Sequence, residues 1–345
     1  MADFIRVCLP SLLLLMCGVT IAEQDFSYDL RMPDVSPKTH DTYFCYSTPR
    51  LPEKEIFITA FEPHAQKETA HHMLLFGCAS PGYDKKDQVW NCGEMSSDND
   101  EANQGPMCQG STKILYAWAM DAPDLKLPEG VGFAIGGDTD INYLVLQVHY
   151  GHIDKFLDGK TTDNSGMTLH FTPEPLKYQA GVYLMATDGK IPKDKTTHLE
   201  TACIYRRGPI LHPFAFRVHT HKLGKVVAAY RVEDDRWTEI GRRNPQLPQM
   251  FYPIKDKSLE IHPGDVLAAR CTMVNNLDHT VYVGATMADE MCNFYMMYYT
   301  NGKIPQDSEC FSARYQWSRD LDVPVDVDKL ASTVPADAGE KPMDM

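Results

Sequence analysis

The sequence predicts an all-β protein of antiparallel sheets, built as two halves that are each stapled by disulfides. Short runs that alternate in polarity or are rich in β-branched and aromatic residues recur along the chain. They span residues 143–150, 214–221, 225–232, 265–271 and 291–299. Clusters of Pro, Gly, Asn and Asp separate these runs. Of the eight cysteines beyond residue 22, four precede residue 110 and four follow residue 200, so each half can carry its own disulfides.

The first element is a leader rather than part of the fold. Arg6 precedes an apolar stretch that ends in small residues near Ala22, which predicts a secretory signal peptide over residues 1–22. The apolar run is shorter than the ~20 residues of a membrane span. We therefore expect a protein that does not span a membrane, located in the secretory pathway, the secretory granule lumen or the extracellular space.

Size and charge limit the function classes. The roughly 320 residues after the leader are enough for two domains of ordinary size. The net charge of −14 argues against a nucleic-acid partner, because phosphates require a face rich in Lys and Arg.

The mature chain keeps eight cysteines after Cys8 and Cys17 leave with the leader. They are Cys45, Cys78, Cys92, Cys108, Cys203, Cys271, Cys292 and Cys310. An even number in an oxidising compartment indicates four disulfides. The pattern alone does not choose among the roughly hundred possible pairings. Zinc is disfavoured because no C-x₂-C pair exists.

The expected domains follow from prolines and composition. Two prolines interrupt the strand pattern at 173–175 and predict a boundary there. The N-terminal β-sandwich domain would then cover 23–174 and the C-terminal one 175–320. Residues 321–345 are acidic and poor in aromatics, which predicts a disordered tail.

The run 214–221 carries the first candidate site. On a strand, alternate side chains share a face, so Arg217, His219 and His221 would project together. Two imidazoles at this spacing can converge on one metal ion. An isolated H-x-H is weak evidence, since such histidines also occur as surface or core residues.

The run 291–297 carries a matching set. The same alternation puts Met291, Asn293, Tyr295 and Met297 on one face. A methionine alone is usually core filler. A site of two histidines and Met291 would select copper, because a thioether suits Cu(I).

The N-terminal half offers three further histidines. His71 and His72 are adjacent, so on a regular strand they would point to opposite faces. They could bind one ion only if the backbone bends or if they use different ring nitrogens. Gln147 and His149 share one face of a half-buried strand. A hydrogen-bonded structural histidine is the alternative, so from residues alone a three-histidine site is only one possibility.

Longer strings make the interpretation specific. The strings lie at residues 71–78, 146–151, 217–227, 240–249, 265–271 and 289–293. In order and spacing they resemble the copper type II, ascorbate-dependent monooxygenases, and among these the members that hydroxylate peptidylglycine. The resemblance runs from about Tyr28 to Cys310.

The resemblance implies two jelly-roll-like β-sandwiches whose two copper ions face each other across a solvent cleft. Ascorbate would be the reductant and O₂ the co-substrate for hydroxylation of the Cα of the C-terminal glycine in glycine-extended peptides. The implied ligands are His71, His72 and His149 for the electron-transfer copper, and His219, His221 and Met291 for the oxygen-binding copper. The implied substrate residues are Arg217, Asn293 and Tyr295 at the peptide carboxylate, Met297 in the pocket and Gln147 near the path between the metals.

The resemblance also implies a disulfide pairing. The pairs are Cys45–Cys92, Cys78–Cys108, Cys203–Cys310 and Cys271–Cys292. A fifth bridge of the vertebrate pattern is missing, because Asn164 stands where a cysteine is usual and no upstream partner remains. We expect a less constrained N-terminus, by at most a few kcal/mol.

The main interpretation has two functional alternatives. Because the chain stops near residue 345, we expect a hydroxylase alone, whose product passes to a separate lyase. One alternative is a dopamine β-monooxygenase-like hydroxylase of a small amine. The other is a secreted copper-binding protein without catalysis.

Overall fold

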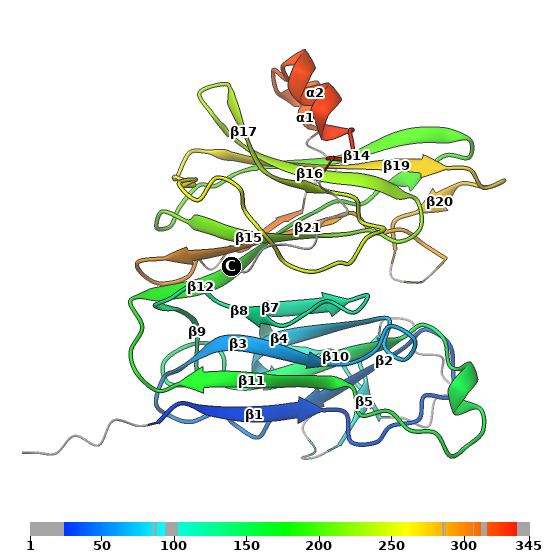
Figure 1. Ribbon diagram of the computed structural model, residues 1–345, viewed down its shortest axis with the longest axis vertical. Coiled ribbons are helices and arrows are strands. Elements are labelled where there is room, and N and C mark those ends of the chain that lie inside the picture. Colours follow the sequence, from blue (N-terminus) through cyan, green and yellow to red (C-terminus); the bar gives the residue numbers. More distant parts are fainter. Residues whose placement is uncertain are drawn as a thin grey trace, which may run out of the picture.

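The computed structural model describes residues 24–83, 85, 88–93, 103–284, 286, 288–305, 307–311 and 316–336. The predicted signal peptide lies outside these residues. The described chain forms two β-sandwiches, one above the other in Figure 1, with the N-terminal half below. The prediction of an all-β, largely antiparallel fold is confirmed.

The N-terminal sandwich has two sheets. One contains β1 (Phe26–Arg31), β11 (Gly166–Thr172), β3 (Ile56–His64), β8 (Leu125–Lys126) and β9 (Val131–Ile135). The other contains β6 (Asn103–Gln104), β5 (Trp90–Asn91), β2 (Thr42–Ser47), β10 (Tyr143–Tyr150), β4 (His72–Pro81) and β7 (Cys108–Ala119). A short 3₁₀ turn, η1 (Asp154–Phe156), follows β10.

The C-terminal sandwich is built in the same way. Its inner sheet contains β12 (Tyr178–Ala186), β21 (Asn293–Thr300), β15 (His212–His219), β18 (Tyr252–Pro253) and β22 (Glu309–Phe311). Its outer sheet contains β14 (Lys195–Ile204), β19 (Val266–Asn275), β16 (Gly224–Glu233) and β17 (Arg236–Arg243). A small pair, β13 (Lys190–Ile191) and β20 (Val281–Tyr282), lies apart from both sheets.

The two halves share one continuous sheet. β12 pairs in parallel with β9, so five strands of each half join into ten. Ala215 and Tyr295 belong to the same apolar cluster as the N-terminal core. The face of β15 that carries Ala215 also carries Arg217 and His219, because alternate residues share a face. The candidate site therefore lies on the surface that the two halves bury against each other.

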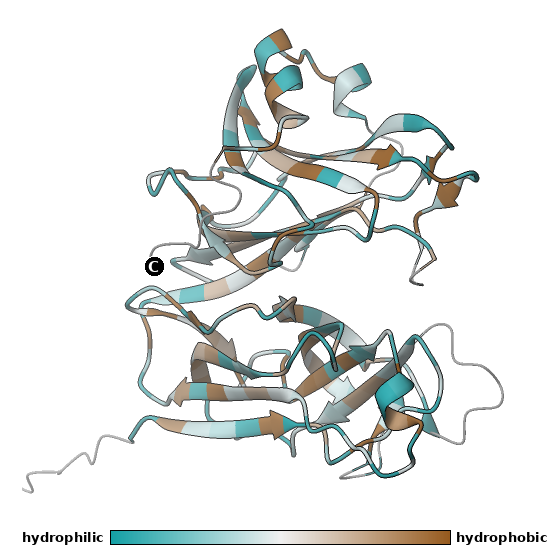
Figure 2. Cartoon of the chain, turned by 45° about the vertical axis from the view of Figure 1, so that its right-hand side comes forward, coloured by the Kyte–Doolittle hydropathy of each residue, from teal (hydrophilic) through white to brown (hydrophobic). Residues whose placement is uncertain are grey.

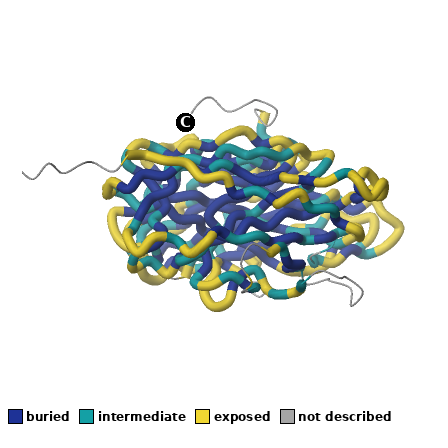
Figure 3. The backbone as a smooth tube through the Cα atoms, turned by 90° about the horizontal axis from the view of Figure 1, so that it is seen from below, coloured by how far each residue is buried: buried dark blue, intermediate teal, exposed yellow. Residues whose placement is uncertain are grey.

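Burial follows the strand pattern. Hydrophobic residues lie along the strands in Figure 2, and in Figure 3 the buried parts of the chain lie inside while exposed parts lie around them. One apolar cluster fills the N-terminal sandwich and extends to the inner sheet of the C-terminal half, and a second fills the C-terminal sandwich. No helix among the described residues is long and apolar enough to cross a membrane.

The structure contains four disulfides in the pairs that the resemblance implied. They are Cys45–Cys92, Cys78–Cys108, Cys203–Cys310 and Cys271–Cys292. Two lie in each half, so each sandwich is stapled separately. Such bonds persist in the oxidising secretory pathway or outside the cell.

The N-terminus is held by pairing where the fifth disulfide is missing. All six residues of β1 pair with β11, from Phe26 opposite Phe171 to Arg31 opposite Gly166. The Arg31 Nε donates to the Asn164 carbonyl at 3.0 Å. Backbone hydrogen bonds thus anchor β1 without the covalent link.

The expectation of a disordered tail is wrong for part of it. Residues Val325–Ala331 form α2, which follows the short helix α1 (Trp317–Asp320) on the outer sheet. The cause is Arg270 on β19, which is fully buried and pairs with Glu200 and Asp328, both at 2.7 Å. A buried cation holds the acidic segment in place, which composition could not indicate.

Candidate metal centre

Three histidines of the N-terminal half converge at one point. His149 on β10 lies directly opposite His72 on β4. His71 precedes β4 in a bend, so the alternation of side chains along the strand does not force it to the face opposite His72. The Nδ1 atoms of His71 and His72 are 3.2 Å apart. Possible ligand atoms of these two residues and His149 all lie within 4.8 Å of one another.

Two neighbouring side chains orient the His149 ring. Its Nε2 lies 3.1 Å from Asp41 Oδ1, and the Tyr43 ring stacks on it at 4.0 Å between centroids. Its Nδ1 is buried and has no hydrogen-bond partner among the described residues. A buried polar atom without a partner is costly, and an imidazole whose outer nitrogen meets a carboxylate is typical of metal ligands. The three residues therefore fit a metal ion held through Nδ1.

Burial keeps these imidazoles neutral. It lowers the pKa of His71 to about 4 and that of His149 to about 3, with smaller contributions from neighbouring charges. It also lowers the pKa of His72 well below its ordinary value. Neutral histidines have the free lone pair that metal binding requires.

The C-terminal set is assembled by the pairing of β15 with β21. His219 lies opposite Asn293, and Arg217 lies opposite Tyr295. The rings of His219 and His221 are 5.4 Å apart. Because β15 ends at His219 and β21 begins at Asn293, His221 and Met291 lie just beyond the strand ends.

Because His221 lies outside the strand, its backbone is held by Glu290 instead of by strand pairing. The Glu290 carboxylate accepts hydrogen bonds from the backbone N–H groups of His221 at 2.9 Å and Leu223 at 2.6 Å. The Nδ1 of His221 lies 2.9 Å from the Asp289 carbonyl. With Nδ1 donating to this carbonyl, Nε2 carries the lone pair that a metal would use. Glu290 immediately precedes Met291, so the same contact fixes both expected ligands.

Gln249 is a site residue that the strand pattern did not reveal. Its Oε1 lies 2.6 Å from His219 Nδ1, and its own amide donates to the carbonyls of Thr220 and Pro245. This leaves the Nε2 of His219 for a metal. Gln249 lies in a loop, where the alternation of strand residues carries no information. The only sequence feature that could have indicated it was the family motif at residues 240–249, which includes Gln249.

Arg217 is a buried cation. Its side chain is 2% exposed, its Nε donates to the Gln249 carbonyl at 2.9 Å, and its guanidinium lies 5.2 Å from the centre of the Tyr295 ring. No salt bridge joins it to a carboxylate within the described parts of the chain. A buried charge without an opposite partner is destabilising, so this site favours an external anion.

The other predicted substrate residues differ in their surroundings. The Asn293 amide donates to the Tyr295 hydroxyl at 3.2 Å and contacts the Met291 sulfur at 3.9 Å, so residues predicted to bind substrate contact one predicted to bind metal. Met297 is fully buried in the apolar cluster. Gln147 is buried on the His149 face of β10, and its amide contacts the Cys92 sulfur at 3.5 Å.

The two histidine sets lie side by side. The rings of His72 and His219 are 6.0 Å apart, and both side chains are buried. The expected solvent cleft between the sets is therefore absent from this arrangement of the described residues. The reason is the continuous sheet and apolar cluster, which bring the halves into contact.

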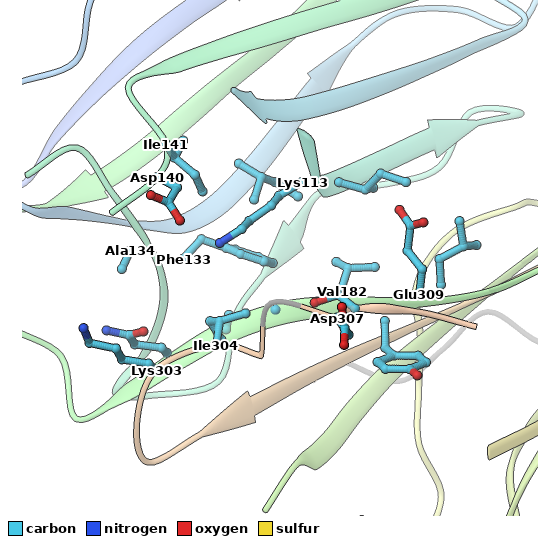
Figure 4. A pocket seen from close by; sticks show the side chains of 18 of the residues that line it. Lys113, Phe133, Ala134, Asp140, Ile141, Val182, Lys303, Ile304, Asp307 and Glu309 are labelled. Carbon is cyan, nitrogen blue, oxygen red and sulfur yellow. The ribbon is translucent and has the colours of Figure 1, made fainter. Parts of the chain in front are cut away.

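A separate cavity of about 1150 Å³ lies between the halves. Figure 4 shows Lys113 and Asp140 of the N-terminal half opposite Ile304 and Asp307 of the C-terminal half. None of the expected metal ligands and neither Arg217 nor Gln249 lines it. The cavity is thus distinct from the histidine cluster.

Comparison with known families agrees with the geometry. Residues 28–157 match the family model "Copper type II ascorbate-dependent monooxygenase, N-terminal domain". Residues 178–319 match the corresponding C-terminal domain.

Individual relatives separate into two groups. Peptidyl-glycine alpha-amidating monooxygenase A of Xenopus laevis is 46% identical over 279 residues, which are 80% of this chain and 28% of the relative. The rat peptidylglycine alpha-amidating monooxygenase is 46% identical over 81% of this chain and 27% of its own length. Bovine dopamine beta-hydroxylase is 30% identical over 80% of this chain and 47% of its own length. The match thus spans less than a third of the amidating relatives.

Proposed function

Because the chain belongs to the copper type II, ascorbate-dependent monooxygenase family, we propose that it hydroxylates the Cα of C-terminal glycine in glycine-extended peptides. O₂ would be the co-substrate and ascorbate the reductant. The product would be a peptidyl-α-hydroxyglycine, the first step of C-terminal amidation. The observation that carries the proposal is Arg217, a buried cation beside His219 without a carboxylate partner among the described residues.

Two sets of residues would hold the metal ions. His71, His72 and His149 would bind one copper through Nδ1, as the partnerless nitrogen of His149 supports. His219, His221 and Met291 would bind the other, with both histidines using Nε2. When bound, copper supplies the electron transfer and oxygen activation that amino-acid side chains lack.

Arg217 would position the substrate. A guanidinium can grip a carboxylate with two parallel hydrogen bonds, and the stacked ring of Tyr295 limits where that carboxylate lies. Residues two apart on a strand are roughly 7 Å apart, so a glycine held by Arg217 extends toward His219. Fixing the glycine in this way lowers the entropic cost of the reaction.

Burial of the site would exclude water. Arg217, His72 and His219 are each less than 10% exposed, which protects reactive species from side reactions. The peptide must still reach Arg217. We infer that the buried side chains around Arg217 move apart locally to admit substrate and close again around it.

A second step would complete amidation. Hydroxyglycine must be cleaved to amide and glyoxylate, and both matched domains are monooxygenase domains. We propose that a separate lyase performs this cleavage, and that both enzymes act in the secretory granule lumen or the extracellular space.

The test is product analysis. A peptide ending in glycine is incubated with the copper-loaded protein, ascorbate and O₂, and in parallel with tyramine as substrate. The expected result is accumulation of the hydroxyglycine peptide without glyoxylate, and little turnover of tyramine. Preferred turnover of tyramine would instead support an amine hydroxylase. Glyoxylate release by the pure protein would contradict the separate lyase, and no O₂ consumption would support a copper-binding protein without catalysis.

A further inference from the structure

Two exposed histidines that the proposed reaction does not use lie next to each other. His40 precedes β2, and His152 follows β10. Their ring centroids are 6.2 Å apart, with the rings nearly perpendicular. The pair joins two segments that also build the buried cluster, because Asp41 contacts His149 and His149 lies three residues before His152.

The spacing of this pair is close to that of two ligands on one ion. Ring centroids within the two proposed copper sites are 4.8–5.4 Å apart. A metal–nitrogen bond is about 2.0–2.1 Å, so two imidazoles on opposite sides of one ion have centroids roughly 6 Å apart. Near-linear binding by two nitrogens is a common geometry for Cu(I). Small rotations of exposed side chains adjust the rest.

The tautomer of His40 is suited to a ligand. Its Nδ1 lies 3.4 Å from the Gly151 carbonyl, which accepts a hydrogen bond but cannot donate one. A proton on Nδ1 therefore leaves the Nε2 lone pair of His40 available to a metal.

The pair is also close to the buried cluster. His72 and His149 are 7% and 1% exposed, whereas His71 is partly exposed. His152 follows His149 by three residues, and Asp41, the residue after His40, lies 3.1 Å from the His149 ring. The exposed pair is thus adjacent in the chain to residues of a site that solvent hardly enters.

We propose that His40 and His152 form a third, exposed copper site, which captures the ion and passes it to His71, His72 and His149. The transfer is a ligand exchange: bonds to the two surface imidazoles break as bonds to the three buried ones form. The oxidation state of copper does not change. This inference rests on the proposed copper function of the buried cluster.

The test measures copper directly. Metal-free wild type and a His40→Ala/His152→Ala double variant receive Cu(I) from a chelator complex, and bound copper is measured against time after gel filtration. We expect wild type to take up a third, weakly held equivalent that the double variant lacks. The double variant should fill its two remaining copper sites several-fold more slowly than wild type, but these two sites should reach the same final occupancy in both proteins. His279→Ala, which removes another exposed histidine, should behave as wild type.

Equal loading rates and equal stoichiometry in wild type and double variant would overturn the proposal. Because both residues are exposed, matching thermal unfolding of the two proteins checks that the fold is unchanged. Hydroxylation at saturating copper should also be unaffected. Normal capture without hydroxylation by wild type would contradict the proposed function but not this site.

Discussion

At the scale of single residues, the site depends on side chains that hold other side chains. Gln249 contacts both His219 and Arg217, and Glu290 fixes the backbone at His221. Removal of such partners typically lowers metal affinity or activity about 10- to 100-fold. The alternation of strands predicted the shared face of Arg217 and His219, but not the loop residues that orient them.

In a Gln249→Glu variant, the new carboxylate should compete with the substrate carboxylate for Arg217. A carboxylate at this position would lie at the Arg217 guanidinium and form an internal ion pair, while still accepting from His219 Nδ1. We expect the KM for a glycine-extended peptide to rise roughly tenfold with copper content retained. Steady-state kinetics with metal analysis checks this. Gln249→Leu is the comparison, since it should lose copper from the His219 site; an unchanged KM in Gln249→Glu would argue against Arg217 as the anchor.

The histidine cluster predicts acid sensitivity of the metal-free protein. In the folded state the pKa of His71 is about 4 and that of His149 about 3, whereas both are near 6.5 in the unfolded chain. The unfolded chain binds more protons between these values, so the contribution of these residues to stability is full above about pH 7 and falls as the pH drops from about 6.5 to about 3. Denaturant unfolding across this pH range should show that the free energy of unfolding decreases less steeply in His149→Gln than in wild type. The same dependence on pH in both proteins would contradict the lowered pKa of His149.

At the scale of elements, short strands and their ends decide the site. The predicted strands at 143–150 and 214–221 appear as β10 and as β15, which ends at His219. Cross-strand register could not be predicted from one sequence, yet it places His149 opposite His72 and Arg217 opposite Tyr295. The bend at His71 and the positions of His221 and Met291 depend on contacts from other elements.

The helices of the C-terminal segment should depend on one buried cation. Arg270→Ala would leave Glu200 buried without its partner, which costs about 3–5 kcal/mol. Asp328→Asn removes a half-exposed partner and should cost about 1 kcal/mol or less. Denaturant unfolding of both variants measures the difference. Similar losses would show that Glu200 is not the main partner of Arg270.

At the scale of the whole molecule, the two halves are less independent than cysteine spacing predicted. The cysteine distribution correctly indicated two stapled halves, but the β9–β12 pairing and the shared apolar cluster link them. The closeness of His72 and His219 is a consequence of that contact. Long-range packing of this kind leaves no signal in local residue patterns.

The shared sheet predicts one cooperative unfolding transition. Leu146→Ala in the N-terminal core and Leu267→Ala in the C-terminal core remove fully buried side chains, at a cost of about 2–5 kcal/mol each. Both should lower the midpoint of a single transition in the oxidised, metal-free protein, as followed by calorimetry and fluorescence. Two transitions, each sensitive to only one substitution, would show that the halves unfold separately.

The central claim is that Arg217 binds the carboxylate of the substrate's C-terminal glycine. The most direct measurement compares kcat/KM for one peptide ending in glycine and in glycinamide, with wild type and Arg217→Gln. We predict a strong preference of wild type for the free carboxylate, and a loss of about 10- to 100-fold for that substrate alone in the variant, as expected for hydrogen bonds to a charged group. Equal turnover of both peptides by wild type, or an unchanged preference in the variant, would contradict the claim.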